Sequence, residues 1–214
     1  QHLPASQSVN YYAVLDGQHR LIAYIKLGLN LNDLVITEPL NVDMSIAALI
    51  AEMNICTTTW KGTDYMAAPA MTLSKTNDVF EFAVQLRSQG FPLATISQWC
   101  TGTNSLKPKD LVNCVKSGEL PKILQSETWY QRSIRWYEAA QGKFSDSFLS
   151  KKYLITYIIM QYNNAADPVA YCHQIEQALK KLTPAQATEI MEARKIGLKS
   201  REQVVVELLE QYLG

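Results

Sequence analysis

From residue 55 to the end of the chain, apolar residues recur every three to four positions, the spacing of helices that bury one face. Signals for strands fade at the same point, and the pattern predicts helices at residues 78–88, 93–99, 108–117, 127–140, 145–163, 168–182, 184–195 and 200–213. Asp167 and Thr183 each precede a first-turn proline, and Ser200 and Gln203 have the spacing of a capping box. Residues 59–214 are therefore expected to form an all-α domain.

The first part of the chain has a different pattern. Residues 11–15 and 34–37 are short apolar runs that end at turn or break residues, which predicts two buried strands. Residues 18–27 have helical spacing with Gly28 placed to close the helix, and a further helix is predicted near residues 43–53. We expect a small α/β unit at residues 1–58. The predicted fold class is α+β and predominantly helical.

The charge balance argues against a chain that binds nucleic acid over its whole surface. Lys and Arg number 20, as do Asp and Glu, so the formal charge is zero, whereas binding to phosphates normally requires an excess of basic residues. Between Lys107 and Lys152 there are nine basic and five acidic residues. That excess favours a solvated helical surface and leaves a local DNA-binding patch as the alternative.

Cysteine usage and hydropathy bear on the compartment. The four cysteines are far apart and form no CxxC pair, which favours buried or free thiols in a reducing compartment. No apolar run approaches the length needed to cross a bilayer, and no secretory leader is recognisable. These features predict a cytoplasmic protein without a membrane partner.

The segment with the most chemistry is Asp16-Gly17-Gln18-His19-Arg20, where a predicted strand gives way to a predicted helix. The unpaired amide groups at a helix start and the helix dipole favour an anion, and an arginine in the first turn adds donors suited to phosphate oxygens. His19 could donate a hydrogen bond or transfer a proton near neutral pH. An ordinary Asp-Gly turn with a solvated arginine is the alternative interpretation.

This motif and its context resemble the DGQHR branch of the ParB/sulfiredoxin superfamily, over residues 12–54. The corresponding turn holds nucleotide phosphates in ParB proteins, which bind CTP, and in sulfiredoxins, which bind ATP. The resemblance implies that Gly17, Gln18, His19 and Arg20 contact phosphate, with Asp16 capping the turn, and that CTP or ATP with Mg is the ligand. Sulfiredoxins carry a cysteine where this chain has Gln18 or its neighbour, so their reductase chemistry is not expected.

Two further features are interpreted through the same resemblance. ParB proteins have a Glu-Asn pair that helps to bind the nucleotide's metal, and Glu52 and Asn54 form an approximate equivalent, which makes them candidate metal ligands. ParB proteins also place a helix-turn-helix after this domain, and residues 78–99 have the outline of one. Its second helix lacks Lys and Arg, and Ile96 and Trp99 have the character of core residues, which favours a plain helical hairpin.

Aromatic residues are dense between Trp129 and Tyr162, and basic residues lie among them. They could stack on bases, but most fall at helical spacing, so packing in the core is the favoured interpretation.

The leading hypothesis is a DNA-associated accessory protein that binds a nucleotide or phosphate group at residues 16–20, with a homo-oligomer left open. The first alternative is a metal-dependent nuclease or nucleotide hydrolase, in which Asp16 and Glu52 hold the metal and His19 assists. The second is a degenerate ParB-like module that only makes protein–protein contacts. Exposure of Arg20 favours the leading hypothesis over this last one, and metal-dependent turnover identifies the enzyme.

Overall fold

The structure is a computed structural model that describes residues 18–33, 69–70, 73 and 75–214. The chain divides into two compact units, residues 1–59 and residues 60–214, and each is described by itself below.

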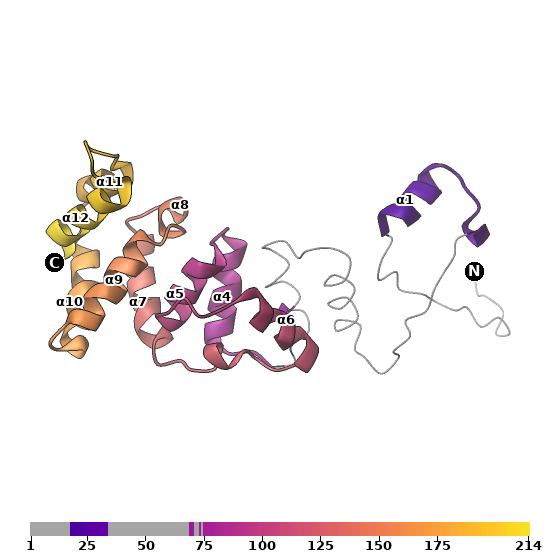
Figure 1. The fold of residues 1–214 in the computed structure, drawn as a ribbon, viewed down its shortest axis with the longest axis horizontal. Coiled ribbons are helices and arrows are strands. Elements are labelled where there is room, and N and C mark those ends of the chain that lie inside the picture. Colours follow the sequence, from indigo (N-terminus) through magenta and orange to yellow (C-terminus); the bar gives the residue numbers. More distant parts are fainter. Residues whose placement is uncertain (1–17, 34–68, 71–72, 74) are drawn as a thin grey trace, which may run out of the picture. The chain divides into compact units, whose positions relative to one another are not determined.

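The described part of the first unit is a short helix followed by a turn. Helix α1 spans Gln18–Lys26, and a 3-10 turn, η1, spans Leu31–Asp33 (Figure 1). Gly28 ends the helix with a φ of 65°, and the amide of Leu29 donates to the carbonyl of Tyr24 at 3.1 Å. This left-handed glycine closure satisfies carbonyls in the last turn, and it confirms the predicted role of Gly28.

The predicted fold class is wrong. Among the described residues 69% are helical and 1% are in bridges, with no sheet, and the bridge pairs Ile196 with Lys199 in a turn. The strands predicted at 11–15 and 34–37, and the helix near 43–53, lie outside the described residues. Short apolar runs are poor indicators of a strand, because periodicity alone does not separate a buried strand from other buried segments. Two strands of four or five residues would also make a marginal sheet.

The second unit is a succession of helices joined by short turns (Figure 1). They are α4 (Asp78–Ser88), α5 (Leu93–Thr101), α6 (Pro108–Ser117), the 3-10 turn η2 (Lys122–Leu124), α7 (Tyr130–Gln141), α8 (Asp146–Leu149), α9 (Tyr153–Asn164), α10 (Pro168–Lys181), α11 (Pro184–Glu192) and α12 (Arg201–Leu213). Most of the predicted helices are confirmed within a few residues.

The helix starts are fixed by the capping residues that the sequence indicates. Asp167 accepts hydrogen bonds from the amides of Val169 and Ala170 at 2.9 and 3.0 Å. Thr183 and Ser200 each form a reciprocal capping box, with Gln186 and Gln203 respectively. A side chain that satisfies these amides contributes about 1 kcal/mol of stability, so the starts of α10, α11 and α12 are set locally.

Helix α5 lies at the centre of the packing and contacts α4, α7 and α9. Ile96, Trp99 and Cys100 on this helix have no exposed surface. The hydroxyl of Ser133 on α7 donates to the carbonyl of Trp99 at 2.6 Å. Since α5 is enclosed by three helices, its position defines the core on which the rest of the unit is assembled.

The aromatic residues form part of this core. The rings of Trp99 and Phe82 each meet the ring of Tyr137 edge-on, with centroids 5.2 Å apart. Trp136, Tyr137, Phe144, Phe148 and Tyr157 are buried, which confirms core packing over base stacking for these side chains. Within the described part of the chain, no helix combines the length and the hydropathy that crossing a membrane requires.

Candidate functional site

The DGQHR segment begins α1. Gln18, His19 and Arg20 form the first turn of the helix, and this turn contains no acidic residue. The first amide groups of a helix have no acceptor within it, and together with the helix dipole they favour an anion. Asp16 and Gly17 lie outside the described residues. The described backbone therefore provides the helix start that an anion site of this type requires.

Arg20 is the member of the motif whose side chain the structure describes, and that side chain is exposed. Its guanidinium offers a planar set of donors that matches two phosphate oxygens at once. The other basic residue of α1, Lys26, is also exposed but lies in the last turn of the helix. The two cations thus mark opposite ends of one helix.

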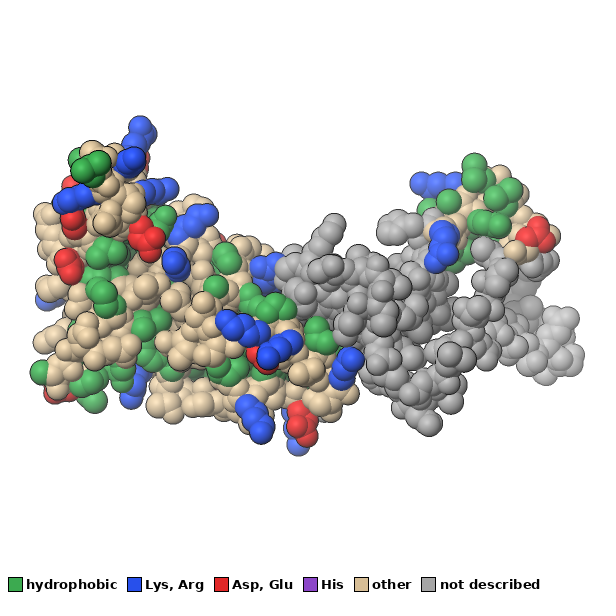
Figure 2. All heavy atoms as spheres, in the orientation of Figure 1, with side chains coloured by type: hydrophobic (Ala, Val, Ile, Leu, Met, Phe, Trp, Pro, Cys, Tyr) green, Lys and Arg blue, Asp and Glu red, His purple; other side chains and the backbone are tan. Residues whose placement is uncertain are grey.

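Helix α1 and the turn that follows it expose several large apolar side chains. Ile22 and Ile25 are 50% and 58% exposed, and Leu27, Leu29 and Leu31 are also exposed. Figure 2 shows hydrophobic side chains on the visible face of this segment, beside Lys and Arg. Isolated exposed apolar residues are common, but a run within ten residues is typical of a contact surface.

The predicted metal ligands Glu52 and Asn54, and Asp16 of the enzyme alternative, lie outside the described residues. Among the residues that are described, no three His, Cys, Asp or Glu side chains are grouped as a metal site would require. The metal ligands stay a prediction.

The α4–α5 pair, which has the outline of a helix-turn-helix, uses the side chains of its second helix for internal contacts. The side-chain amide of Gln98 donates to the hydroxyl of Thr156 at 3.0 Å, and the backbone carbonyl of Gln98 accepts from the indole of Trp129 at 3.1 Å. Thr95, Ile96, Ser97, Trp99 and Cys100 are buried. Little of α5 is left to enter a DNA groove, and a DNA-reading role for this pair stays a prediction.

The described cysteines are unsuited to nucleophilic chemistry. Cys100, Cys114 and Cys172 are free and buried. Burial raises the pKa of the Cys114 thiol to about 11 and raises the pKa values of Cys100 and Cys172 as well. Since the thiolate is the reactive species, these three side chains act as small apolar groups in the core.

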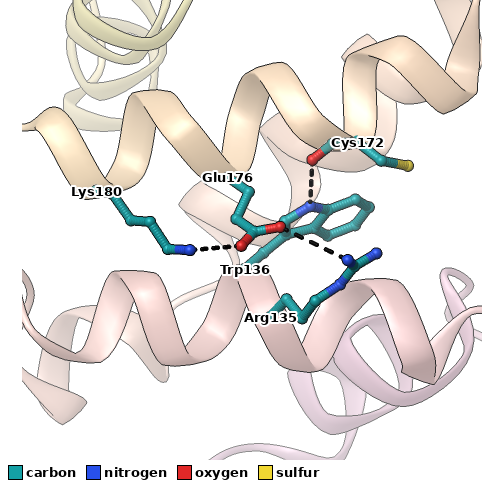
Figure 3. A network of polar contacts seen from close by, with 5 residues as sticks. All are labelled: Arg135, Trp136, Cys172, Glu176 and Lys180. Atoms are coloured by element: carbon teal, nitrogen blue, oxygen red, sulfur yellow. Dashed lines mark hydrogen bonds and ion pairs between the residues drawn. The ribbon is translucent and has the colours of Figure 1, made fainter.

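A polar network joins α7 to α10 (Figure 3). Lys180 donates to Glu176 at 2.6 Å, and Arg135 lies 3.9 Å from the other oxygen of that carboxylate. The indole of Trp136 donates to the carbonyl of Cys172 at 3.1 Å. The hydrogen bond from Lys180, assisted by the charges of Lys180 and Arg135, lowers the pKa of Glu176. An ionised carboxylate held by two cations is unsuited to donate a proton near neutral pH, so the network orients two helices.

Two hollows lie on the C-terminal helices. One, of about 560 Å³, is lined by residues of α10, α11 and α12 that include His173, Lys181 and Tyr212. Of these side chains, the hydroxyl of Tyr212 donates to Glu189 at 2.7 Å. The second, of about 490 Å³, is lined by Arg194, Lys195 and Arg201, with Met191, Glu192 and Ala193.

The basic residues of this second hollow are a feature that the sequence interpretation missed. Residues 193–201 hold four basic residues and no acidic one, but residues 184–195 were predicted as helix. The helix instead ends at Glu192, which places Arg194 and Lys195 in an exposed turn. A count of charge in short windows, rather than over 46 residues from Lys107 to Lys152, would have found the cluster.

No family model, no curated protein and no solved structure matches this chain. The resemblance described above therefore rests on the motif and its flanking residues.

Proposed function

We propose that the chain is a DNA-associated accessory protein that binds a nucleotide, or another phosphate ligand, at the start of α1. The observation that carries the proposal is the exposed Arg20 in the first turn of a helix that begins at Gln18. Because the Arg20 side chain is exposed, a ligand can reach it. A motif that served only as a structural turn would be expected to have this side chain buried.

The local charges support an anionic ligand. Among the helical residues of the first turn of α1 there is no acidic side chain. A helix N-terminus and an arginine fork act on the same anion, and hydrogen bonds to charged groups contribute about 1.5–3 kcal/mol each. Gly17 and Gln18 would supply amides, Arg20 would bind oxygens and His19 would orient them.

The ligand that we propose is CTP or ATP with Mg, with Asp16 capping the turn and Glu52 and Asn54 near the metal. The nucleotide would act as a switch for association with DNA rather than as a substrate. A reducing, cytoplasmic compartment is proposed as well, and the three buried free thiols support it.

The test is calorimetric titration of the full chain with CTP and with ATP, each in the presence of Mg. Three proteins are compared: the unaltered chain, Arg20→Ala and Lys26→Ala. Arg20→Ala is expected to weaken binding about tenfold or more, because the loss of one charge-assisted hydrogen bond exceeds 1.4 kcal/mol. Lys26→Ala removes the same charge from the other end of the helix and is expected to change binding by less than about twofold.

Equal losses in the two variants would mean that the helix attracts nucleotides only through its net charge, and no binding to the unaltered chain would refute the proposal. Steady release of inorganic phosphate that requires Mg and disappears in Asp16→Asn would identify the hydrolase alternative instead.

A protein-contact role for α1 is the second candidate, and the exposed Ile22, Ile25 and Leu29 favour it. Ile22 and Ile25 are three positions apart and so share one face of the helix, and Leu29 follows just beyond its end. If this surface binds a second copy of the chain, Ile22→Asn with Ile25→Asn is expected to shift the sedimentation coefficient toward that of the monomer. An unchanged coefficient would exclude self-association through this face.

A further inference from the structure

The turn between α11 and α12 has a defined shape. Ile196 and Lys199 pair through two backbone hydrogen bonds of 3.3 and 3.0 Å, so a tight turn joins two short arms, residues 194–196 and residues 199–201. Arg201, at the end of the second arm, is already the first residue of α12. Gly197 has a φ of 58° at the first central position, as a two-residue turn of this kind requires. At the tip Leu198 is fully exposed and Ile196 is 64% exposed.

Each arm of the turn carries two cations. Arg194 and Lys195 precede the tip, and Lys199 and Arg201 follow it. Lys199 lies 2.7 Å from Glu207, and Arg201 donates to the carbonyl of Met191 at 2.8 Å. Within the part of the chain that the structure describes, Arg194 and Lys195 have no ion-pair partner. The first arm therefore retains more of its positive charge than the second arm does.

Two of the nearby carboxylates, Glu202 and Glu207, form ion pairs with Lys152 and Lys199. Glu202 lies 3.9 Å from Lys152 of the neighbouring segment, which brings a further cation close to the start of α12. Glu192 lines the hollow together with Arg194, Lys195 and Arg201, so the cations there outnumber the acid by three to one. Figure 2 shows Lys and Arg side chains at this end of the helical unit, near α11 and α12, with Asp and Glu side chains among them.

We infer that this turn, residues 194–201, is a contact surface for duplex DNA, with its apolar tip at the base edges of a groove and its cations on the flanking phosphates. The inference deepens the proposed association with DNA by naming the surface that makes the contact. The major groove is about 12 Å wide and admits elements as wide as a two-stranded β-ribbon, so the narrower tip of this turn fits it, and thymine methyl groups offer an apolar partner to Leu198 and Ile196. Cations on both arms then face phosphates on either side of the groove.

An anionic membrane is the other surface that basic and apolar side chains fit. The shape favours DNA, because the turn joins a projecting tip to a hollow of about 490 Å³ lined by Arg194, Lys195 and Arg201. A duplex has ridges of phosphate beside its grooves, so it can fill both features at once. A planar bilayer would meet the tip and leave the hollow open to water.

The experiment measures binding of the full chain to a fluorescent random-sequence duplex at several salt concentrations. The unaltered chain is compared with Arg194→Gln/Lys195→Gln, with Leu198→Ser, and with Lys75→Gln/Lys181→Gln. The last variant is the matched control, because both lysines are exposed, lie outside residues 107–152 and 194–201, and give the same change in net charge. Circular dichroism checks that each variant is folded, and all changes lie on exposed side chains.

Removal of two phosphate contacts is expected to reduce the slope of log affinity against log salt by about 1.8, since each contact contributes about 0.9. Leu198→Ser is expected to weaken binding several-fold and leave the slope unchanged, because it removes an apolar contact and no charge. The control variant should lose much less affinity for the duplex than Arg194→Gln/Lys195→Gln, which is called the basic-turn variant below.

Equal losses for the basic-turn variant and its control would overturn the inference, as would a chain that binds no duplex. Binding to phosphatidylserine vesicles in preference to the duplex would identify a membrane surface and also overturn it. Titration of the basic-turn variant with CTP or ATP separates the two proposals, because nucleotide binding through Arg20 is expected to be unchanged even if the DNA contact fails.

Discussion

At the scale of single residues, Gly102 is required both by the backbone conformation at the end of α5 and by the side chain that packs against it. It ends α5 with a φ of 70°, and a Cβ atom placed there would lie 2.7 Å from the ring of Trp129. The indole of Trp129 also donates to the carbonyl of Gln98 in the last turn of α5. The ring therefore covers the end of α5, and only a residue without a side chain permits that approach.

Gly102→Ala is expected to destabilise the protein by about 2–5 kcal/mol, from the left-handed backbone and from displacement of the Trp129 ring. Gly118→Ala is the matched control, because Gly118 has a φ of 69° at the end of α6 with nothing within 4 Å of its Cβ position. It should cost about 1 kcal/mol, the backbone part alone. Urea unfolding measures both, and equal losses would show that the Trp129 ring moves aside freely.

Glu176 makes the stability of the α7–α10 contact depend on pH. Its pKa is lowered below the ordinary value of 4.5, first by the hydrogen bond from Lys180. A carboxyl group with a lowered folded-state pKa stabilises the fold fully above the unfolded-state pKa, and this stabilisation disappears as the pH falls through the folded-state pKa. Glu176→Gln should therefore be less stable than the unaltered protein at pH 7 and should converge with it in acid.

Thermal unfolding between pH 7 and pH 3 measures that convergence. Glu138→Gln, on the exposed side of α7 and without an ion pair among the described contacts, is the control and should leave the pH profile unchanged. A constant difference between Glu176→Gln and the unaltered protein at every pH would mean that the carboxylate acts only through its shape.

At the scale of elements, the caps determine where the C-terminal helices begin. Thr183→Ala is expected to destabilise the protein by about 1 kcal/mol, because it removes the side chain that caps α11 together with Gln186. Thr188→Ala removes the same atoms from an exposed position inside the same helix, where alanine has the higher helix propensity. It should be neutral or slightly stabilising in urea unfolding, and a loss as large as that of Thr183→Ala would count against the capping role.

The same caps explain which elements could be predicted from the sequence. Asp167, Thr183 and Ser200 are local signals, so the starts of α10, α11 and α12 follow from a few neighbouring residues. The predicted helix at residues 145–163 is two helices, α8 and α9, because Phe148 and Leu149 pack into the core before the chain turns at Ser150. Both segments have apolar helical spacing, and spacing alone does not reveal a turn between them.

The candidate site was predictable only in part. The helix start at Gln18 and the closure at Gly28 follow from the local sequence. The α/β fold was wrong because strands depend on partners that are distant in the chain, which short apolar runs do not specify. The basic turn at residues 194–201 was missed because helical spacing continues beyond Glu192, where the structure ends α11.

At the scale of the whole molecule, residues 60–214 form a compact unit of their own. One hydrophobic cluster of buried residues extends from Val79 on α4 to Leu213 on α12. A unit of this size with a continuous core is able to fold alone.

A fragment of residues 60–214 is therefore expected to show a helical circular dichroism spectrum and one cooperative thermal transition. Its midpoint should lie within about 4 °C of the corresponding transition in the full chain, the shift that about 1 kcal/mol produces at this size. A broad, non-cooperative transition would mean that the first unit contributes to this core.

The clustering of indoles in this core has a spectroscopic consequence. Trp99 and Trp136 are buried, and the ring of Trp129 meets that of Trp136 edge-on at 5.5 Å. These are three of the four tryptophans in the chain, and they lie on or beside α5 and α7. Three of the four indoles therefore sense the surroundings of the junction between these two helices. A red shift in the tryptophan emission would report the separation of α5 from α7, as a built-in optical probe of the helical core.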